Sequence, residues 1–127
     1  MNIYAVAVSA HDLPRAVAFY EALGFRFPPA EPGDPHLESV PDGGIRLMID
    51  AAAMLEGLLG EPPRPGNAAG FALRYAFPAE VDATAAGVPA AGGTVVTEPW
   101  DAPWSQRYAT VADPDGHRVD LFCPLPG

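Results

Sequence analysis

Residues 8–25, VSAHDLPRAVAFYEALGF, decide how this chain folds. Asp12 is a favourable helix N-cap, and Pro14 stands in the first turn, where its missing N–H costs little. Apolar residues then recur at helical spacing until Gly24, a residue type that commonly ends helices. These features predict a helix over residues 13–23.

Turn-forming residues mark the ends of the other expected elements in the same way. Short alternating runs bounded by Gly, Pro and Asp predict strands, and apolar runs closed by glycine predict helices. Strands are expected over residues 2–9, 25–30, 35–40, 45–50, 70–77, 93–97, 105–112 and 117–122, and further helices over residues 51–59 and 80–91. A linker rich in Pro and Gly is expected over residues 60–69, between modules of about residues 1–60 and 70–127.

The two halves of the chain repeat one order of elements: strand, helix, strand, strand, strand. A shift of 68 positions places Asp12 on Glu80 and Gly24 on Gly92. One half alone would expose a sheet face. We therefore expect a single α+β domain, in which two βαβββ modules form a curved eight-stranded sheet around a cup, with the helices outside.

Two stretches of the chain resemble the vicinal oxygen chelate superfamily of glyoxalases, bleomycin resistance proteins and dioxygenases. The run from Val8 to Phe25 is similar to that family's first helix, and residues 112–121, ADPDGHRVDL, are similar to its last hairpin. Because these motifs stand in order at both ends, the resemblance implies the glyoxalase/bleomycin resistance fold over the full length. It implies no single activity, since the fold hosts isomerases, dioxygenases, transferases and plain binding proteins.

Enzymes of this family hold a divalent metal with His and Glu side chains on four inward-facing strands. The resemblance implies that the matching positions here are Ala5, Arg46, either Phe71 or Leu73, and Asp120. Only Asp120 offers a ligand oxygen, whereas a divalent site needs three or more suitable protein ligands. We therefore expect no metal and no other cofactor. His11 and His117 are expected to be exposed.

Four residues of these strands are candidates for binding a ligand. Asp120 either faces the ligand, paired with Arg46 across the cup so that an ion pair replaces the metal charge, or is a solvent-facing residue on an edge. His36 begins an expected strand and is a candidate to face the cup. Phe71 is a candidate for an aromatic wall of the cup.

Residues 98–108, EPWDAPWSQRY, contain both tryptophans of the chain. Two prolines stiffen this segment, so its rings lose little conformational entropy on binding. It is similar to the P-W-G-x-R-Y segment of antibiotic-binding family members, with Ser105 in place of the glycine. Trp104, Trp100 and Tyr108 are therefore candidates to stack on a planar ligand. The alternative is that the tryptophans plug the sheet edge or pack at a dimer interface.

Composition limits the partners. The 127 residues carry a net charge of −9 with only seven basic side chains, which argues against nucleic acid and anionic membranes and permits a cationic or neutral ligand. There is no basic leader at the N-terminus, and no apolar run reaches transmembrane length. Cys123 is the single cysteine and is expected to be a buried hydrophobe. We expect a cytoplasmic protein.

Three functions stay open at this point. The leading hypothesis is a metal-free binding protein of the antibiotic-resistance type, which sequesters a planar or cationic metabolite. The second is a lyase, isomerase or dioxygenase-like enzyme of the same fold, which uses Asp120, His36 or Tyr108 for acid–base chemistry or binds metal at a non-standard site. The third is a structural or regulatory partner with an empty cup, which a fully filled cavity would favour. The resemblance also implies a homodimer.

Overall fold

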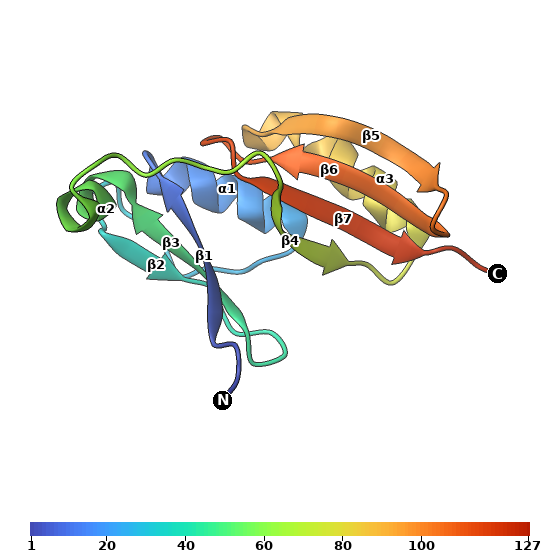
Figure 1. Cartoon of the computed structure of the whole chain (residues 1–127), viewed down its shortest axis with the longest axis horizontal. Helices are drawn as coiled ribbons and strands as arrows, with labels where there is room; N and C mark the ends of the chain where they lie inside the picture. The colour runs from blue at the N-terminus through green and yellow to red at the C-terminus, as the bar shows by residue number, and fades with distance from the viewer.

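The helix expected from residues 8–25 forms as α1, Leu13–Leu23, in a computed structural model that describes residues 1–127. The side chain of Asp12 caps it by accepting a hydrogen bond from the Arg15 N–H at 3.2 Å. Gly24 ends it in the left-handed region, with φ of 116°. The apolar face of α1 is buried, which fixes the helix in the centre of the molecule (Figure 1).

The strands form two sheets. A three-stranded sheet has the order β1-β3-β2, with β1 at Ala5–Ala10, β2 at His36–Glu38 and β3 at Arg46–Ala51. A four-stranded sheet has the order β4-β7-β6-β5, with β4 at Ala69–Arg74, β5 at Thr94–Ala102, β6 at Gln106–Ala112 and β7 at Arg118–Pro124. In each sheet the first pair is parallel and the others are antiparallel. The repeated order confirms the α+β fold of paired modules.

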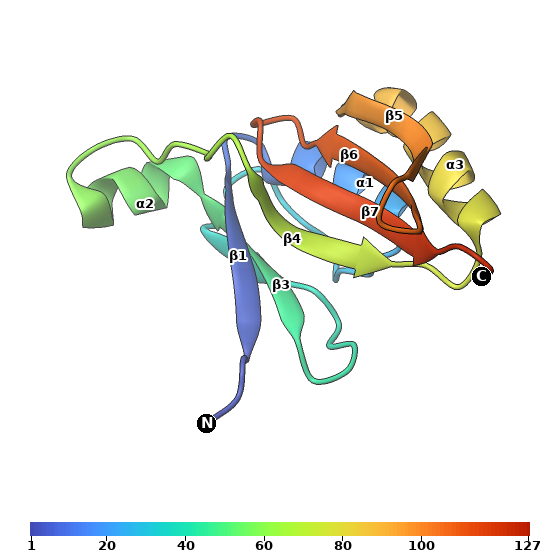
Figure 2. The same ribbon diagram turned by 45° about the vertical axis from the view of Figure 1, so that its right-hand side comes forward.

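Two further helices complete the fold. α2, Ala52–Leu59, follows β3 and lies away from the second sheet, whereas α3, Pro78–Gly87, covers one face of the four-stranded sheet (Figures 1 and 2). A short 3-10 helix, η1, covers Pro89–Ala91. The single helix expected over residues 80–91 is therefore two helices, of which the first, α3, begins two residues earlier than expected. Among the helices of this structure, none combines the length and the apolar character needed to cross a membrane.

The strand expected over residues 25–30 does not form, so the structure has seven strands rather than eight. Pro28 and Pro29 lack the N–H groups that a sheet requires. One backbone hydrogen bond, from the Val40 N–H to the Arg26 carbonyl at 2.8 Å, marks the place where this edge strand would pair. The prolines therefore reduce a fourth strand of the first sheet to a loop.

β5 is longer than the strand expected over residues 93–97, because it continues to Ala102. Trp100 therefore lies on a strand, opposite Tyr108 of β6, and not in a loop. Only the turn around Ser105 separates β5 from β6. Ser105 has a φ of 64°, a left-handed conformation that glycine adopts more readily.

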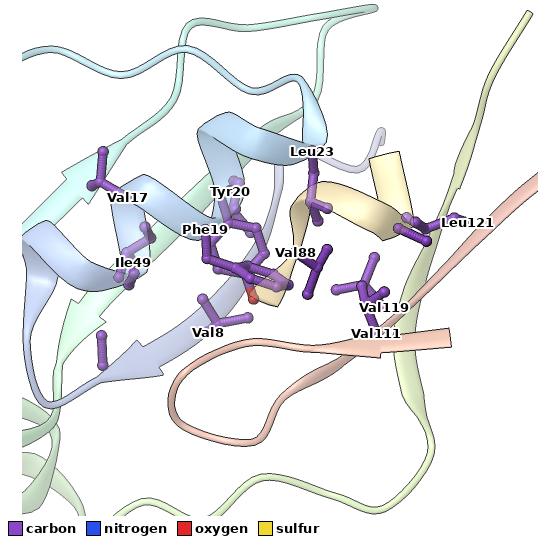
Figure 3. Close-up of a cluster of buried hydrophobic side chains, with 14 of the residues drawn as sticks. Val8, Val17, Phe19, Tyr20, Leu23, Ile49, Val88, Val111, Val119 and Leu121 are labelled. Atoms are coloured by element: carbon purple, nitrogen blue, oxygen red, sulfur yellow. The ribbon is translucent and has the colours of Figure 1, made fainter. Parts of the chain in front are cut away.

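One hydrophobic core of 19 buried residues runs through both halves of the chain. Phe19 and Tyr20 of α1 lie at its centre, fully buried and edge to face, with ring centroids 4.9 Å apart (Figure 3). The first half adds residues of β1 and β3, and the second half adds residues of α3, β6 and β7. The expected burial of Cys123 is confirmed, since it is 3% exposed.

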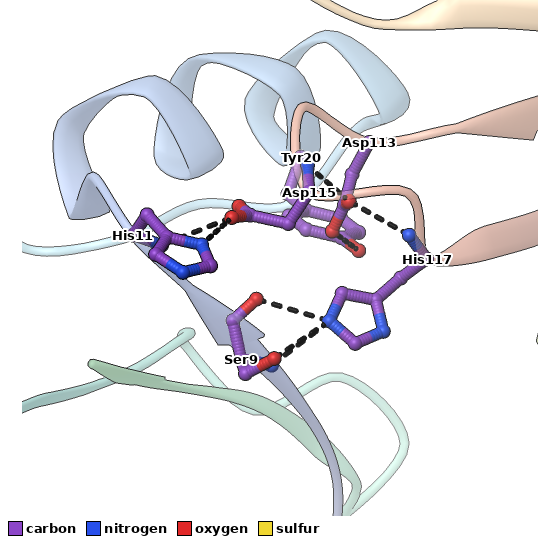
Figure 4. Close-up of polar contacts among 6 residues, drawn as sticks. All are labelled: Ser9, His11, Tyr20, Asp113, Asp115 and His117. Carbon is purple, nitrogen blue, oxygen red and sulfur yellow. Dashed lines mark hydrogen bonds and ion pairs between the residues drawn. The ribbon is translucent and has the colours of Figure 1, made fainter. Parts of the chain in front are cut away.

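A polar network also joins the two halves (Figure 4). The buried carboxylate of Asp113 accepts hydrogen bonds from the Tyr20 hydroxyl at 2.7 Å and from the N–H groups of Asp115 and His117 at 2.9 Å. Nε2 of His117 lies 2.9 Å from the hydroxyl of Ser9, on β1. The ADPDGHRVDL hairpin is thus bonded directly to the first half.

The histidines of this region differ in exposure. His11 is exposed as expected, with 75% of its side chain accessible and Nδ1 at 2.7 Å from the Asp115 carboxylate. The expectation for His117 is wrong, because its ring turns inward to Ser9 and is half-buried. Its partner is 108 positions away in the sequence, so no local pattern reveals the contact.

Candidate functional site

One face of the four-stranded sheet is not covered by any helix (Figures 1 and 2). Side chains alternate across β6 and β7, so every second residue points to the same face. Val111, Val119 and Leu121 are fully buried in the core beside α3. Tyr108 and Asp120 follow the opposite alternation and are only partly buried. We call the face that carries them the open face.

Four aromatic rings form a continuous row on the open face: Trp100, Trp104, Tyr108 and Phe122. The indole rings of Trp100 and Trp104 meet edge to face, with centroids 5.6 Å apart, and Trp104 meets Tyr108 in the same way at 5.2 Å. Tyr108 stacks on Phe122 at 6.4 Å. The tryptophans are 41% and 54% exposed, respectively. This aromatic row offers flat apolar surface to solvent instead of filling the core.

The rings of the aromatic row are held in place by hydrogen bonds. Trp104 donates its indole N–H to the side-chain oxygen of Gln106 at 3.0 Å. The Asp120 carboxylate accepts short hydrogen bonds from the hydroxyls of Tyr108 and Thr110, the latter at 2.6 Å. Burial, and then the bond to Asp120, raise the pKa of Tyr108 to about 12, so this hydroxyl remains a donor at neutral pH. A fixed carboxylate thus lies beside the aromatic row.

The first sheet carries a chain of polar side chains, which we call the polar chain: Asp50, His36, Glu38, Arg46 and Tyr4. His36 Nδ1 lies 2.6 Å from Asp50 and Nε2 lies 2.8 Å from Glu38. Arg46 lies 3.6 Å from Glu38, donates to the Tyr4 hydroxyl at 2.8 Å, and stands over the Tyr4 ring at 4.1 Å. Hydrogen bonds to Asp50 and then Glu38 raise the pKa of His36, so its cationic form is favoured.

The structure does not bring Arg46 and Asp120 together as an ion pair. Arg46 is bonded to Glu38 and Tyr4 in the first sheet, and Asp120 is bonded to two hydroxyls in the second. Each side chain is therefore bonded within its own sheet, although Nε of Arg46 is buried without a hydrogen-bond partner. Of the predicted site residues, the structure brings together Trp100, Trp104, Tyr108 and Asp120, while Arg46 and His36 meet separately in the polar chain.

The strand pairing tests the positions where relatives hold a metal. Ala5 lies opposite Arg46 in the parallel pair β1–β3, and Ala72 lies opposite Asp120 in the parallel pair β4–β7. Phe71 and Leu73, the two choices that the resemblance gives on β4, lie on either side of Ala72. Only Asp120 among the four has a ligand oxygen, so these residues do not fit a three-ligand divalent site. Nowhere do three or more His, Cys, Asp or Glu side chains gather closely enough to hold a metal.

Phe71 does not belong to the open face. It packs against the hydrophobic core and meets the ring of Phe25 edge to face, with centroids 6.3 Å apart. A shift of one residue moves a side chain to the other face of a strand, and β4 has an irregular register between Ala69 and Phe71.

Several residues of these clusters escaped the sequence analysis. Phe122, Thr110 and Gln106 share the alternation of Asp120 and Tyr108, and that period of two is the signal that reveals them. Asp50 and Glu38 join His36 through the pairing of β2 with β3, which places His36 opposite Asp50. No local pattern predicts that register.

Several solved structures with a similar fold are described as glyoxalase or bleomycin resistance proteins. A glyoxalase-related enzyme from Fulvimarina pelagi matches with a TM-score of 0.82 at 24% identity, over 97% of this chain and 88% of that one. A family member from Burkholderia phytofirmans matches with a TM-score of 0.78 at 17% identity, over 98% and 100%. TnmS3, an antibiotic binding protein from Streptomyces, matches with a TM-score of 0.65 at 29% identity, over 98% and 96%.

Sequence relatives point to the same family. A Mycobacterium tuberculosis protein named "Putative glyoxylase CFP32" is 34% identical over 113 residues, which are 87% of this chain. Its Mycobacterium bovis counterpart matches equally, and the chain spans only 40% of the length of these curated relatives. The model of the glyoxalase/bleomycin resistance protein/dioxygenase superfamily matches residues 2–121. With this match over nearly its whole length, the chain belongs to the glyoxalase/bleomycin resistance protein/dioxygenase superfamily.

Proposed function

We propose that this protein is a metal-free binding protein, which sequesters a planar, cationic small molecule such as a metabolite or an antibiotic. The observation that carries the proposal is the exposed aromatic row beside the fixed carboxylate of Asp120. Aromatic faces attract planar rings and cations, and a nearby carboxylate favours the cation further. The net charge of −9 acts in the same direction over longer distances.

Two other observations support this proposal. The positions Ala5, Arg46 and Ala72 cannot supply metal ligands, so the family's usual metal chemistry has no donor set at this place. TnmS3, a relative by structure at 29% identity, is described as an antibiotic binding protein. We also propose that the protein is a homodimer in which a second copy stands opposite the open face and completes a cup around the aromatic row, because a single chain leaves the row exposed on one side.

Binding without turnover is the test of this function. Proflavine, a planar cationic dye, should quench the tryptophan fluorescence of the protein and be recovered unchanged. Trp104→Ala should weaken binding by about thirtyfold, or about 2 kcal/mol, because it removes the central ring of the row. Phe77→Ala is the matched control, since Phe77 is 66% exposed and lies outside the row. Equal affinity of Trp104→Ala and the native protein contradicts the proposal.

A second variant tests the charge of the ligand. Asp120→Asn keeps the shape of the side chain and removes its charge. It should weaken binding of the cationic dye and leave binding of a neutral planar analogue unchanged. A sedimentation measurement at micromolar concentration tests the homodimer, and a monomer would contradict that part of the proposal.

A second candidate function is acid–base catalysis at Asp120. It is favoured by the direct hydrogen bond between the Tyr108 hydroxyl and the Asp120 carboxylate, which joins a proton donor to an acceptor on an exposed face. The two functions are distinguished by the fate of the ligand. Chemical change of a bound compound that is lost in Asp120→Asn favours the enzyme over the binding protein. Stoichiometric metal in the purified protein would favour an enzyme with a non-standard site.

A further inference from the structure

A hollow lies between the two halves of the chain, away from the strands that carry the aromatic row. It has a volume of about 400 Å³ and is lined by the end of α1 and the following residues 23–26, by residues 40–42 after β2, and by residues 73–75 at the end of β4. No residue of β5, β6 or β7 takes part. In Figure 2 the loop after β2 and the end of β4 extend from different sheets toward the same side of the molecule. Small-molecule pockets usually measure about 300–1,000 Å³.

The walls of this hollow combine apolar side chains with two arginines. Leu23, Phe25 and Leu73 supply apolar surface, and Arg26 and Arg74 supply the charge. The Tyr75 hydroxyl donates to the Leu23 carbonyl at 2.7 Å, which ties the second half to the end of α1. The two sides of the hollow are therefore held at a fixed spacing.

The two arginines of the hollow lack partners. All seven basic side chains of the protein are arginines. Four of them are occupied, since Arg46, Arg64 and Arg107 contact carboxylates and Arg118 donates to a carbonyl. The guanidinium groups of Arg26, Arg74 and Arg15 make no hydrogen bond or ion pair, and two of these three line one hollow.

A shortage of carboxylates does not explain why Arg26 and Arg74 lack ion-pair partners. The chain has 16 acidic residues, so carboxylates are available to pair with these arginines. Asp42 lines the same hollow, and yet it forms no ion pair with Arg26 or Arg74. Guanidinium groups recognise carboxylates through paired hydrogen bonds, and unoccupied groups in a concave site keep all their donors available.

We propose that this hollow binds a small organic acid, with its carboxylate on Arg26 and Arg74 and a compact apolar body against Leu23, Phe25 and Leu73. The site is separate from the aromatic row and takes a ligand of the opposite charge. Because its walls come from both halves, the bound acid also stabilises the fold.

Naphthoate is a suitable probe, and naphthamide is its neutral counterpart of the same shape. In the isotope-labelled full chain, millimolar naphthoate should shift the amide signals of residues 24–26, 40, 42 and 73–75. Naphthamide should bind about tenfold more weakly, since it cannot form the charge-assisted hydrogen bonds. Failure of naphthoate to bind, or shifts confined to the aromatic row, would overturn the proposal.

Variants identify the arginines. Arg26→Gln and Arg74→Gln should each weaken naphthoate about tenfold. Arg15→Gln is the matched control, because Arg15 is exposed, as Arg26 and Arg74 are, and lies outside the hollow. Asp42→Asn should tighten binding roughly threefold by removing a repelling charge. An equal loss in Arg15→Gln and Arg26→Gln would show that only the net charge of the protein matters, and it would reject the site. Trp104→Ala separates the two proposals, since it should leave naphthoate binding intact.

Discussion

Gly93 shows how closely a single residue is fitted into the core. A Cβ atom at this position would lie 2.7 Å from the Ala112 carbonyl and closer still to the ring of Phe19. Phe19 is fully buried and has no room to move aside. We expect Gly93→Ala to lower the free energy of unfolding by about 1–3 kcal/mol, as overpacked cores do.

Urea denaturation measures this effect. Gly87→Ala is the control, because nothing lies within 4 Å of its added Cβ and the position belongs to α3. This substitution should leave stability unchanged or raise it by up to about 1 kcal/mol. Native stability of Gly93→Ala would mean that the Phe19 ring can shift.

His36 makes stability depend on pH. Hydrogen bonds to Asp50 and then Glu38 raise the pKa of His36 above its ordinary value of 6.5. A raised pKa means that the folded state binds the proton more tightly than the unfolded state. The stabilisation is therefore complete below about pH 6.5 and is lost as the pH rises through the folded pKa. Since the group is largely solvated, we expect less than about 1 kcal/mol.

The comparison of native protein with His36→Gln isolates this effect. Urea denaturation at pH 5.5 should give a larger stability difference between the two proteins than denaturation at pH 8.5. The imidazole signals of His36 in an NMR titration should move with a midpoint above 6.5. The same stability difference at both pH values would refute the role assigned to the polar chain.

The β5–β6 turn is strained at one position. Ser105 adopts a φ of 64° while its N–H donates to the Ala102 carbonyl at 3.0 Å. A left-handed backbone costs a residue with a Cβ about 1–2 kcal/mol, and glycine avoids this cost. Glycine also has more conformational freedom in the unfolded state, which offsets part of the stabilisation. We expect Ser105→Gly to raise the free energy of unfolding by about 0.5–1 kcal/mol. Ser105→Ala keeps the Cβ, and a comparable gain there would exclude backbone strain as the cause.

Elements whose signals are local could be predicted from the sequence. The cap, the early proline, the helical spacing and the terminal glycine of α1 all lie within one stretch, and the expected range 13–23 is confirmed at Leu13–Leu23. Elements that depend on distant partners were predicted less well. The edge segment 25–30 has strand-like residues but lacks N–H groups at Pro28 and Pro29. The strand expected over residues 93–97 is shorter than β5, because two register shifts interrupt the alternation of β5.

In the candidate site, too, the parts that lie in one stretch of sequence could be predicted, and the parts that depend on distant partners could not. Trp100, Trp104 and Tyr108 stand in one stretch, and their proximity to one another follows from the hairpin that joins β5 to β6. The register of β4 against β7 was not predictable, because an irregularity at Ala69 to Phe71 shifts the alternation by one residue. For this reason Ala72, and not Phe71, lies opposite Asp120.

The two halves should unfold as one unit, because the 19-residue core and the network around Asp113 are shared between them. Both tryptophans lie in the second half. Leu47→Ala in the first half removes a fully buried side chain and should cost about 2–5 kcal/mol. The loss should be the same whether unfolding is followed by tryptophan fluorescence or by far-ultraviolet circular dichroism. A fluorescence transition that stays at its native midpoint would instead indicate two separate folding units.

The edge-to-face contact between Trp100 and Trp104 has an optical consequence. Two indoles with centroids 5.6 Å apart and planes at 87° are close enough for their electronic transitions to couple, and they are held in a fixed chiral arrangement. The near-ultraviolet circular dichroism of the protein should therefore contain a two-signed band that neither tryptophan produces alone. A compound that enters between the rings would collapse this band, so binding of the proposed ligand could be followed without a label.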